Sequence, residues 1–266
     1  EALRQELQAA GHYFRTRSDT ETILLAWRAW GTGCVGRLNG MFAFALWDST
    51  QQTLLLARDR LGEKPLDYAW LPDGTLAFAS EPAALLTLPQ ISRRLDPAAI
   101  DDYFALGYVP DPATIHRAIR RLQPAHFMLL RRGAPLSGTE AACAPQRYWA
   151  LPTAPGSAPD DAPGELAARL DLAVRARLMA DVPLGAFLSG GVDSAGVAAM
   201  AARAAAGPLA TFTIGFEGPG DERAQAAAVA LRYGTAHVAE AGSTDYIAAA
   251  AEQARLFGEP FGDHSS

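Results

Sequence analysis

The 266-residue sequence contains only two cysteines, Cys34 and Cys143, which lie far apart and lack the spacing of metal ligands. We expect two free thiols in a reducing compartment, with a structural disulfide as the alternative. Positive charge is also scarce. Lysine and arginine number 23 against 29 aspartates and glutamates, and the formal net charge is −6. A basic face for nucleic acid is therefore not expected.

No apolar run is long enough for a membrane helix. The most apolar segment, Ala195–Ala206, is interrupted by Arg203 and falls short of the roughly 20 residues that a span needs. No secretory signal opens the chain, so we expect no membrane partner and a cytoplasmic location. The chain starts at Glu1 inside a helical pattern and stops at Ser266 without a closing cap. We expect it to be a piece of a longer polypeptide.

The first 90 or so residues show the pattern of helices over a largely antiparallel sheet. A helix is expected over 18–30, because Ser18 or Asp19 can cap its first amides. Apolar runs at 41–47 and 53–58 predict a hairpin. Two more strands, at 66–71 and 75–80, are expected around a Pro-Asp-Gly turn.

Beyond residue 164 the pattern alternates between helix and strand. Helices are expected at 165–179, after the glycines up to 203, at 223–232 and at 245–256, and strands at 183–188, 209–215 and 237–238. This order predicts a parallel sheet with helices on both faces. Residues 133–164 are rich in proline and glycine and predict a linker between two domains.

The stretch Ser189-Gly190-Gly191-Val192-Asp193-Ser194 follows a predicted strand and opens a predicted helix. Two glycines let the backbone turn tightly, and the first helical amides lack intrahelical acceptors, so the expected ligand is an anion such as a polyphosphate. The spacing excludes the Walker and dinucleotide loops, since Gly191 stands where the Walker lysine would be. Simple turn chemistry is the alternative.

This hexapeptide resembles the pyrophosphate loop of the N-type ATP pyrophosphatases, which split ATP between its α and β phosphates to adenylate an oxygen. Its flanks, 181–188 and 211–216, resemble the synthetase domain of glutamine-dependent asparagine synthetases. Residues similar to the later part of that family's glutaminase domain are 18–21, 40–48, 57–66 and 78–81. The stretch 104–112 is similar to the branch found with bacterial exopolysaccharide and exosortase systems.

The resemblance implies two domains of α+β and α/β class. Residues 1–132 would be the later part of the glutaminase domain, in a partial N-terminal-nucleophile αββα sandwich. Residues 133–164 would be the linker. Residues 165–266 would be the first part of the ATP pyrophosphatase domain, with a partial Rossmann-like parallel sheet.

The resemblance also implies roles for particular residues. Asp19 matches the carboxylate that binds the amino group of glutamine, with a plain helix cap as the alternative. Asp193 is the candidate for contact with Mg²⁺. The residues that match the ATP site are Phe187, Leu188, Ser189, Gly190, Gly191, Val192, Asp193, Ser194 and Ile214. The helix start Asp221-Glu222-Arg223 resembles an acidic segment that could equally be dipole pairing.

Several positions depart from the family pattern. Gly258 stands where the family usually has aspartate, Phe187 replaces a common leucine, and Asp67 a common tyrosine. The glutaminase of the family uses an N-terminal cysteine as nucleophile. Residue 1 here is Glu1, so no catalytic residue is assigned within this sequence.

The implied reaction of the parent enzyme releases ammonia from glutamine and passes it to an aspartyl adenylate, which gives asparagine, AMP and pyrophosphate. The implied partners are glutamine, ATP and aspartate or a related acceptor, and a homodimer is the assembly we retain. Two alternatives remain at this point. One is an amidotransferase or cyclase with another acceptor, such as a β-lactam synthetase or a surface-polysaccharide enzyme. The other is a nucleotide-binding remnant without catalysis.

We predict that the 266-residue chain does not turn over glutamine, because neither internal cysteine supplies its own α-amine as a base. The measurement is ammonia release from glutamine over time. Sustained release well above a protein-free background would contradict the prediction.

Overall fold

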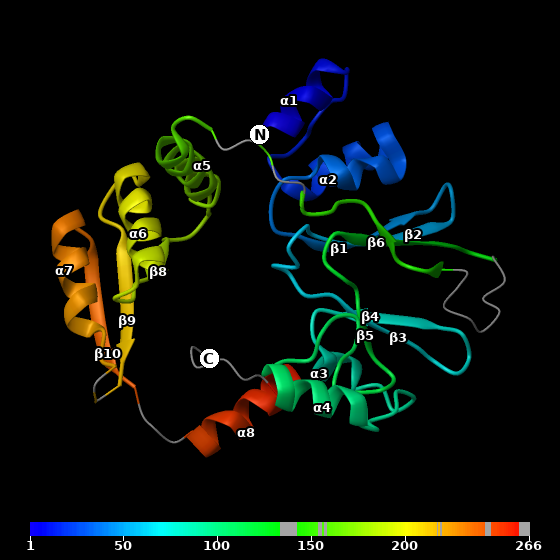
Figure 1. The fold of residues 1–266 in the computed structure, drawn as a ribbon. Helices are drawn as coiled ribbons and strands as arrows, with labels where there is room; N and C mark the ends of the chain where they lie inside the picture. Colours follow the sequence, from blue (N-terminus) through cyan, green and yellow to red (C-terminus); the bar gives the residue numbers. More distant parts are fainter. Residues whose placement is uncertain are drawn as a thin grey trace. The chain divides into compact units, whose positions relative to one another are not determined.

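The computed structural model describes residues 1–133, 143–153, 156, 159–216, 218, 220–242 and 246–260. The chain forms two compact units. One comprises Glu1–Pro152 with Ile247–Ser266, and the other Thr153–Tyr246. Both units combine helices with a sheet or sheets, which confirms the mixed α/β class (Figure 1). Within the described residues, no helix is both long and apolar enough to pass through a lipid bilayer.

The first unit contains two antiparallel sheets, in the orders β1-β2-β6-β7 and β4-β3-β5. Its helices are α1 (Ala2–Ala9), α2 (Asp19–Trp30), α3 (Pro82–Leu85), α4 (Pro97–Leu106) and α8 (Tyr246–Phe257), with a 3-10 segment η1 (Gly31–Arg37). Its strands are β1 (Ala43–Asp48), β2 (Thr53–Arg58), β3 (Asp67–Trp70), β4 (Leu76–Ala79), β5 (Arg120–Arg121), β6 (His126–Arg131) and β7 (Gln146–Arg147). The predicted hairpins at β1–β2 and β3–β4 are confirmed.

Strand β2 shows how the first unit is layered, because its successive side chains enter two different cores. Leu55 and Ala57 pack in a cluster with side chains from α1 and α2. Leu56 packs on the other face, in a cluster with Tyr68 of β3 and Met128 of β6. A third cluster joins Ala69 of β3 to residues of α3. Helices, first sheet, second sheet and α3 therefore follow one another as layers.

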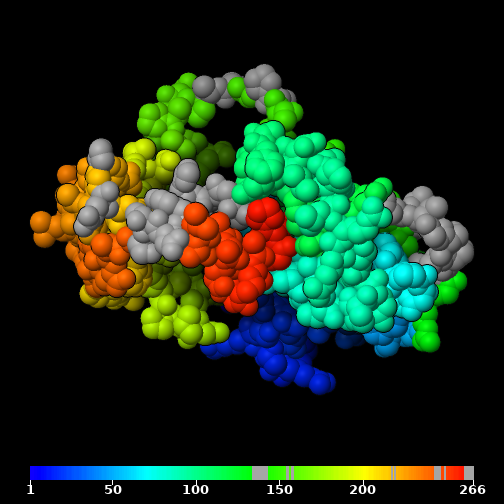
Figure 2. Space-filling view, turned by 90° about the horizontal axis from the view of Figure 1, so that it is seen from below, coloured from blue at the N-terminus to red at the C-terminus, as the bar shows by residue number. Residues whose placement is uncertain are grey.

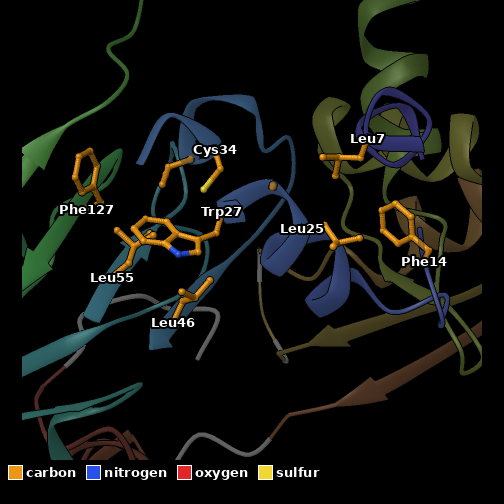
Figure 3. Packing of buried hydrophobic residues seen from close by; sticks show 11 residues of the cluster. Leu7, Phe14, Leu25, Trp27, Cys34, Leu46, Leu55 and Phe127 are labelled. Carbon is orange, nitrogen blue, oxygen red and sulfur yellow. The ribbon is translucent and has the colours of Figure 1, made fainter. Parts of the chain in front are cut away.

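Trp27 of α2 is the largest buried side chain in the cluster that joins α1 and α2 to the first sheet (Figure 3). It lies beside Leu46 and Leu55, and burying such a side chain stabilises a fold by about 2 kcal/mol or more. Its indole nitrogen donates a hydrogen bond of 2.8 Å to Asp48 at the end of β1. The polar atom of the tryptophan is thus satisfied, and α2 is fixed against the end of the hairpin.

Both cysteines are free and buried, as expected. Cys34 lies in the same cluster as Trp27, and burial raises the pKa of its thiol to about 11.

The loop after β2 is organised by two neighbouring buried charges. Asp59 is 1% exposed and accepts backbone hydrogen bonds from Phe42, Leu61, Glu63 and Lys64 at 2.9–3.3 Å. Burial opposes ionisation, but these amides outweigh it and hold the pKa of the Asp59 carboxyl below its ordinary value. The loop therefore folds around a carboxylate.

Arg58 complements this carboxylate from the strand side. Its guanidinium donates to the carbonyls of Gly62, Lys64 and Leu122 and to the Asp111 carboxylate, all within 2.9 Å. Gly62 has φ +71°, and a β-carbon there would lie 2.8 Å from the Arg58 guanidinium. The close approach requires glycine.

The second unit contains a three-stranded parallel sheet in the order β10-β9-β8. Its strands are β8 (Gly185–Phe187), β9 (Ala210–Gly215) and β10 (Ala236–Ala241), and its helices α5 (Ala162–Ala176), α6 (Val192–Ala204) and α7 (Arg223–Tyr233). The predicted alternation of strand and helix is confirmed. Side chains of α6 and α7 pack with Leu188 on one face of the sheet, whereas Phe212 of the other face is 42% exposed. Helices on a second face stay a prediction.

Regular structure extends into the stretch predicted as a linker. Strand β7 pairs with β6 through Phe127 and Gln146, and helix α5 starts at Ala162, where Asp161 caps the amide of Gly164. The prolines and glycines of this stretch predicted an irregular connection. Pro163, however, lies in the first turn of helix α5, where proline is well tolerated. The predicted domain boundaries themselves stay a prediction.

Asp59→Ala should lower the free energy of unfolding of the first unit by ~3 kcal/mol, because it leaves several buried amides without an acceptor. All five tryptophans lie in residues 1–149, so tryptophan fluorescence in a guanidinium titration reports on this unit. Asp73→Ala is the matched control, since Asp73 is exposed and its hydrogen bonds are local ones within a turn, chiefly with the Thr75 amide at 2.9 Å. Equal losses in both variants would contradict the role given to Asp59.

Candidate functional site

The predicted phosphate loop lies between the end of β8 and the start of α6. The backbone amide of Leu188 donates to the Phe212 carbonyl at 2.8 Å, which extends the pairing of β8 with β9 by one residue. The Leu188 side chain is 2% exposed and packs with alanines of α6 and α7. The loop therefore leaves a strand end that is anchored both by the ladder and by the core.

Two serine hydroxyls hold the loop closed on itself. The oxygens Oγ of Ser189 and Ser194 are 2.7 Å apart, and the Ser189 amide donates to Ser194 Oγ at 3.1 Å. The Gly191 amide donates to Ser189 Oγ at 3.2 Å. The sequence placed both hydroxyls in the loop, and the structure brings them into direct contact.

The glycines of the loop have close neighbours. A β-carbon on Gly190 would lie 3.0 Å from Cβ of Gln225 and 3.3 Å from Cβ of Glu222, and one on Gly191 would lie 3.3 Å from Ser189 Oγ. Such contacts are tighter than ordinary packing, so a larger residue at Gly190 would shift its neighbours on α7, and one at Gly191 would shift the Ser189 hydroxyl. Gly191 is the N-cap of α6 and has no side chain to satisfy the first amides of that helix.

One backbone amide of the loop already donates a hydrogen bond to a carboxylate. The Gly190 amide donates to Glu222 Oε2 at 3.1 Å. The neighbouring Asp221 instead pairs with Arg223 at 2.7 Å, and that hydrogen-bonded guanidinium lowers the pKa of Asp221. The segment 221–223 thus does more than meet the positive end of α7, because Glu222 shows that this part of the loop attracts an anion.

The remaining predicted ATP-site residues are exposed around the loop. Phe187 is paired with Phe212 in the parallel register, and Ile214 follows two residues later, so these side chains share one face of the sheet. Phe187 is 81% exposed and Ile214 60% exposed. Val192 and Asp193, in the first turn of α6, are exposed as well. Their contacts with adenosine or Mg²⁺ stay predictions, and within the described ranges no three His, Cys, Asp or Glu side chains gather as a metal centre.

Asp19 is the first residue of α2 and is exposed. Its carboxylate accepts from the Thr20 amide at 2.7 Å, and the hydroxyl of Ser18, the N-cap, accepts from the same amide at 3.2 Å. Glu21 accepts from the hydroxyl and amide of Thr16 and the amide of Arg15, and chiefly the Thr16 hydroxyl lowers the pKa of Glu21. The chain before α2 is thereby fixed, and the role of Asp19 toward glutamine stays a prediction.

Residues 1–149 match the family model described as a glutamine amidotransferase domain, and residues 165–266 match the model described as asparagine synthase. The first match covers more than half of the chain and defines the class as glutamine amidotransferases. With the second match, the chain belongs to the glutamine-hydrolysing asparagine synthetase family of amidotransferases.

Relatives of known name agree with this assignment. A Mycobacterium bovis protein provisionally named a glutamine-hydrolyzing asparagine synthetase is 40% identical over 98% of this chain and 40% of its own length. Asparagine synthetase [glutamine-hydrolyzing] 3 of Bacillus subtilis is 37% identical over 82% of this chain and 35% of its own length. The chain thus spans well under half the length of these curated relatives.

Proposed function

We propose that the chain is part of an enzyme that takes ammonia from glutamine and uses ATP to amidate aspartate, giving asparagine, AMP and pyrophosphate. The loop Ser189–Ser194 carries this proposal, because it offers glycine amides and hydroxyls at the head of α6 beside a strand end. The two family matches support it from both halves of the chain. They do not favour a different acceptor or a remnant without catalysis.

The finer architecture is also part of the proposal. The sequence of helices, sheet, sheet and helix in the first unit supports an N-terminal-nucleophile αββα sandwich, and the parallel sheet of the second supports a Rossmann-like pyrophosphatase. We propose the domain limits 1–132 and 165–266, joined by 133–164. The partners proposed are small molecules, the location cytoplasmic and the assembly a homodimer.

The loop fits a diphosphate by the chemistry of its donors. The Gly190 amide already donates to a carboxylate, and the first turn of α6 has no side-chain cap, which suits an anion. The Gly191 amide and the hydroxyls of Ser189 and Ser194 hydrogen-bond within the loop and would exchange these partners for the phosphates. Phe187, Leu188, Val192 and Ile214 would border the nucleoside at the strand ends. Mg²⁺, for which Asp193 is the proposed ligand, would supply positive charge that offsets the phosphates. Asp19 would bind the amino group of glutamine in the first unit.

Ser194→Ala should weaken ATP binding about tenfold, or ~1.4 kcal/mol, because it removes a hydroxyl donor and frees Ser189 from its partner. Isothermal titration of the chain with ATP and Mg²⁺ measures the change. Ser92→Ala is the control, since Ser92 lies in the first unit and only accepts a turn amide from Arg94. An unchanged affinity in Ser194→Ala would remove the loop from the ATP site.

Glu222→Gln should tighten pyrophosphate binding about threefold, or ~0.7 kcal/mol, because the carboxylate competes for the Gly190 amide and repels the incoming anion. Titration with pyrophosphate alone measures this, and Glu165→Gln on α5 is the charge-matched control. Weaker binding in Glu222→Gln would mean that the carboxylate helps to hold the anion instead of opposing it.

A further inference from the structure

The end of α8 belongs to the asparagine synthase match but packs in the unit built from the amidotransferase match. The synthase match covers residues 165–266, whereas the compact unit of residues 1–152 also includes the segment from Ile247 onward. Figure 2 shows the end of α8, in red, against the region of α3 and α4, in green. The short segment 257–260, which we call the strap, makes the specific contacts.

The backbone of the strap is fitted closely to the amidotransferase unit at Gly258. This residue ends α8 with φ +78°, and its carbonyl accepts a hydrogen bond of 2.9 Å from Nε2 of His116, a side chain that is buried. A β-carbon on Gly258 would lie 2.5 Å from the backbone nitrogen of Ala83 in α3. The backbone of α3 cannot yield as a flexible side chain would, so only glycine permits this contact.

The side chain of Glu259 enters a buried cluster of charges. It forms an ion pair with Arg121, and both side chains are 15% exposed. Arg121 also pairs with the fully buried Asp67 at 2.9 Å and lies 3.8 Å from Asp111. Asp111 in turn pairs with Arg58 at 2.8 Å. The strap thus adds one carboxylate to a network that the amidotransferase unit already contains.

Counting charges shows that this network is complete without the strap. Arg58 and Arg121 balance Asp67 and Asp111, so docking Glu259 adds one negative charge in excess. One oxygen each of Asp67 and Glu259 is buried with no hydrogen-bond partner, and both residues line a cavity of about 310 Å³. Arg121 favours binding of the strap, and the excess negative charge opposes it. When the strap leaves, neither buried arginine is left without an acidic partner.

We propose that residues 257–260 are a releasable strap, which Arg121 and His116 hold on the amidotransferase unit and which thereby connects the two matched stretches of the chain. The proposal goes beyond the proposed function, and needs neither nucleotide nor glutamine to be true. Two of the three departures from the family pattern noted in the sequence lie at this place: Gly258 is part of the strap, and Asp67 shares Arg121 with Glu259.

Docking of the strap should depend on pH, because a carboxyl group beside it can take up a proton. Burial, opposed by Arg121 and helped by the negative charge of Glu259, raises the pKa of Asp67 to about 6. The other charged or titratable groups at this place are Arg58, Asp111, His116 and Glu81, the last lining the same cavity. Because docked Glu259 favours protonated Asp67, linkage requires that acid favours docking, and that docking weakens as the pH rises through about 6.

The test is hydrogen exchange of the backbone amides at the end of α8, followed by mass spectrometry on the 266-residue chain. Glu259→Gln should speed their exchange at least tenfold at pH 7. Glu252→Gln is the matched control, because it removes an exposed ion pair with Arg255 on the same helix and leaves the strap intact. Tryptophan fluorescence verifies that the first unit remains folded in each variant.

Gly258→Ala should release the strap by the clash with Ala83 and speed exchange to a similar degree. Gly107→Ala is its control, since Gly107 has φ +81° but no atom within 4 Å of an added β-carbon. Exchange at the wild-type rate in both Glu259→Gln and Gly258→Ala would overturn the proposal. The protection of these amides in the wild type and in Glu259→Gln is compared with that in Glu252→Gln at pH 7 and at pH 5.5. A difference between the wild type and Glu259→Gln that is the same at both pH values would overturn the pH dependence.

Discussion

A charge that leaves water must find its partners inside the protein, and the first unit is built on this constraint. Arg58 and Asp59 are adjacent in the chain and both buried, yet they do not pair with each other. The carboxylate of Asp59 gathers backbone amides and the guanidinium of Arg58 gathers backbone carbonyls, so the loop 58–66 is shaped from both sides. Since this loop leads from β2 of one sheet to β3 of the other, the stacking of the two sheets depends on it.

The sequence was informative wherever a pattern is local. Short apolar runs and a Pro-Asp-Gly turn identified the strands β1 to β4, and the capping residue Ser18 located α2 within one residue. The loop Ser189–Ser194 was identifiable because its glycines and hydroxyls are consecutive, so that strand, turn and helix suffice to position them. Boundaries were less accurate near Pro163, where the same residue type can break a helix or begin one.

Long-range pairing could not be read in the same way. Arg121 was visible only as one of two neighbouring arginines, and nothing local connects it with Asp67, 54 positions earlier, or with Glu259, 138 positions later. Glu222 had a local explanation as an acidic helix start, which hid its contact with Gly190. The departures at Asp67 and Gly258 were the available signal, because a buried acid and a glycine in place of common residues each need a structural reason.

The parallel sheet of the second unit leaves one face uncovered by the helices described. Phe187, Phe212 and Ile214 expose 81%, 42% and 60% of their surface on that face. Neighbouring exposed apolar side chains of this kind form a hydrophobic surface, which favours self-association. The net charge of −6 counteracts this by mutual repulsion between molecules. Self-association of the chain should therefore increase with ionic strength, because added salt weakens the electrostatic repulsion and leaves the exposed apolar face unchanged.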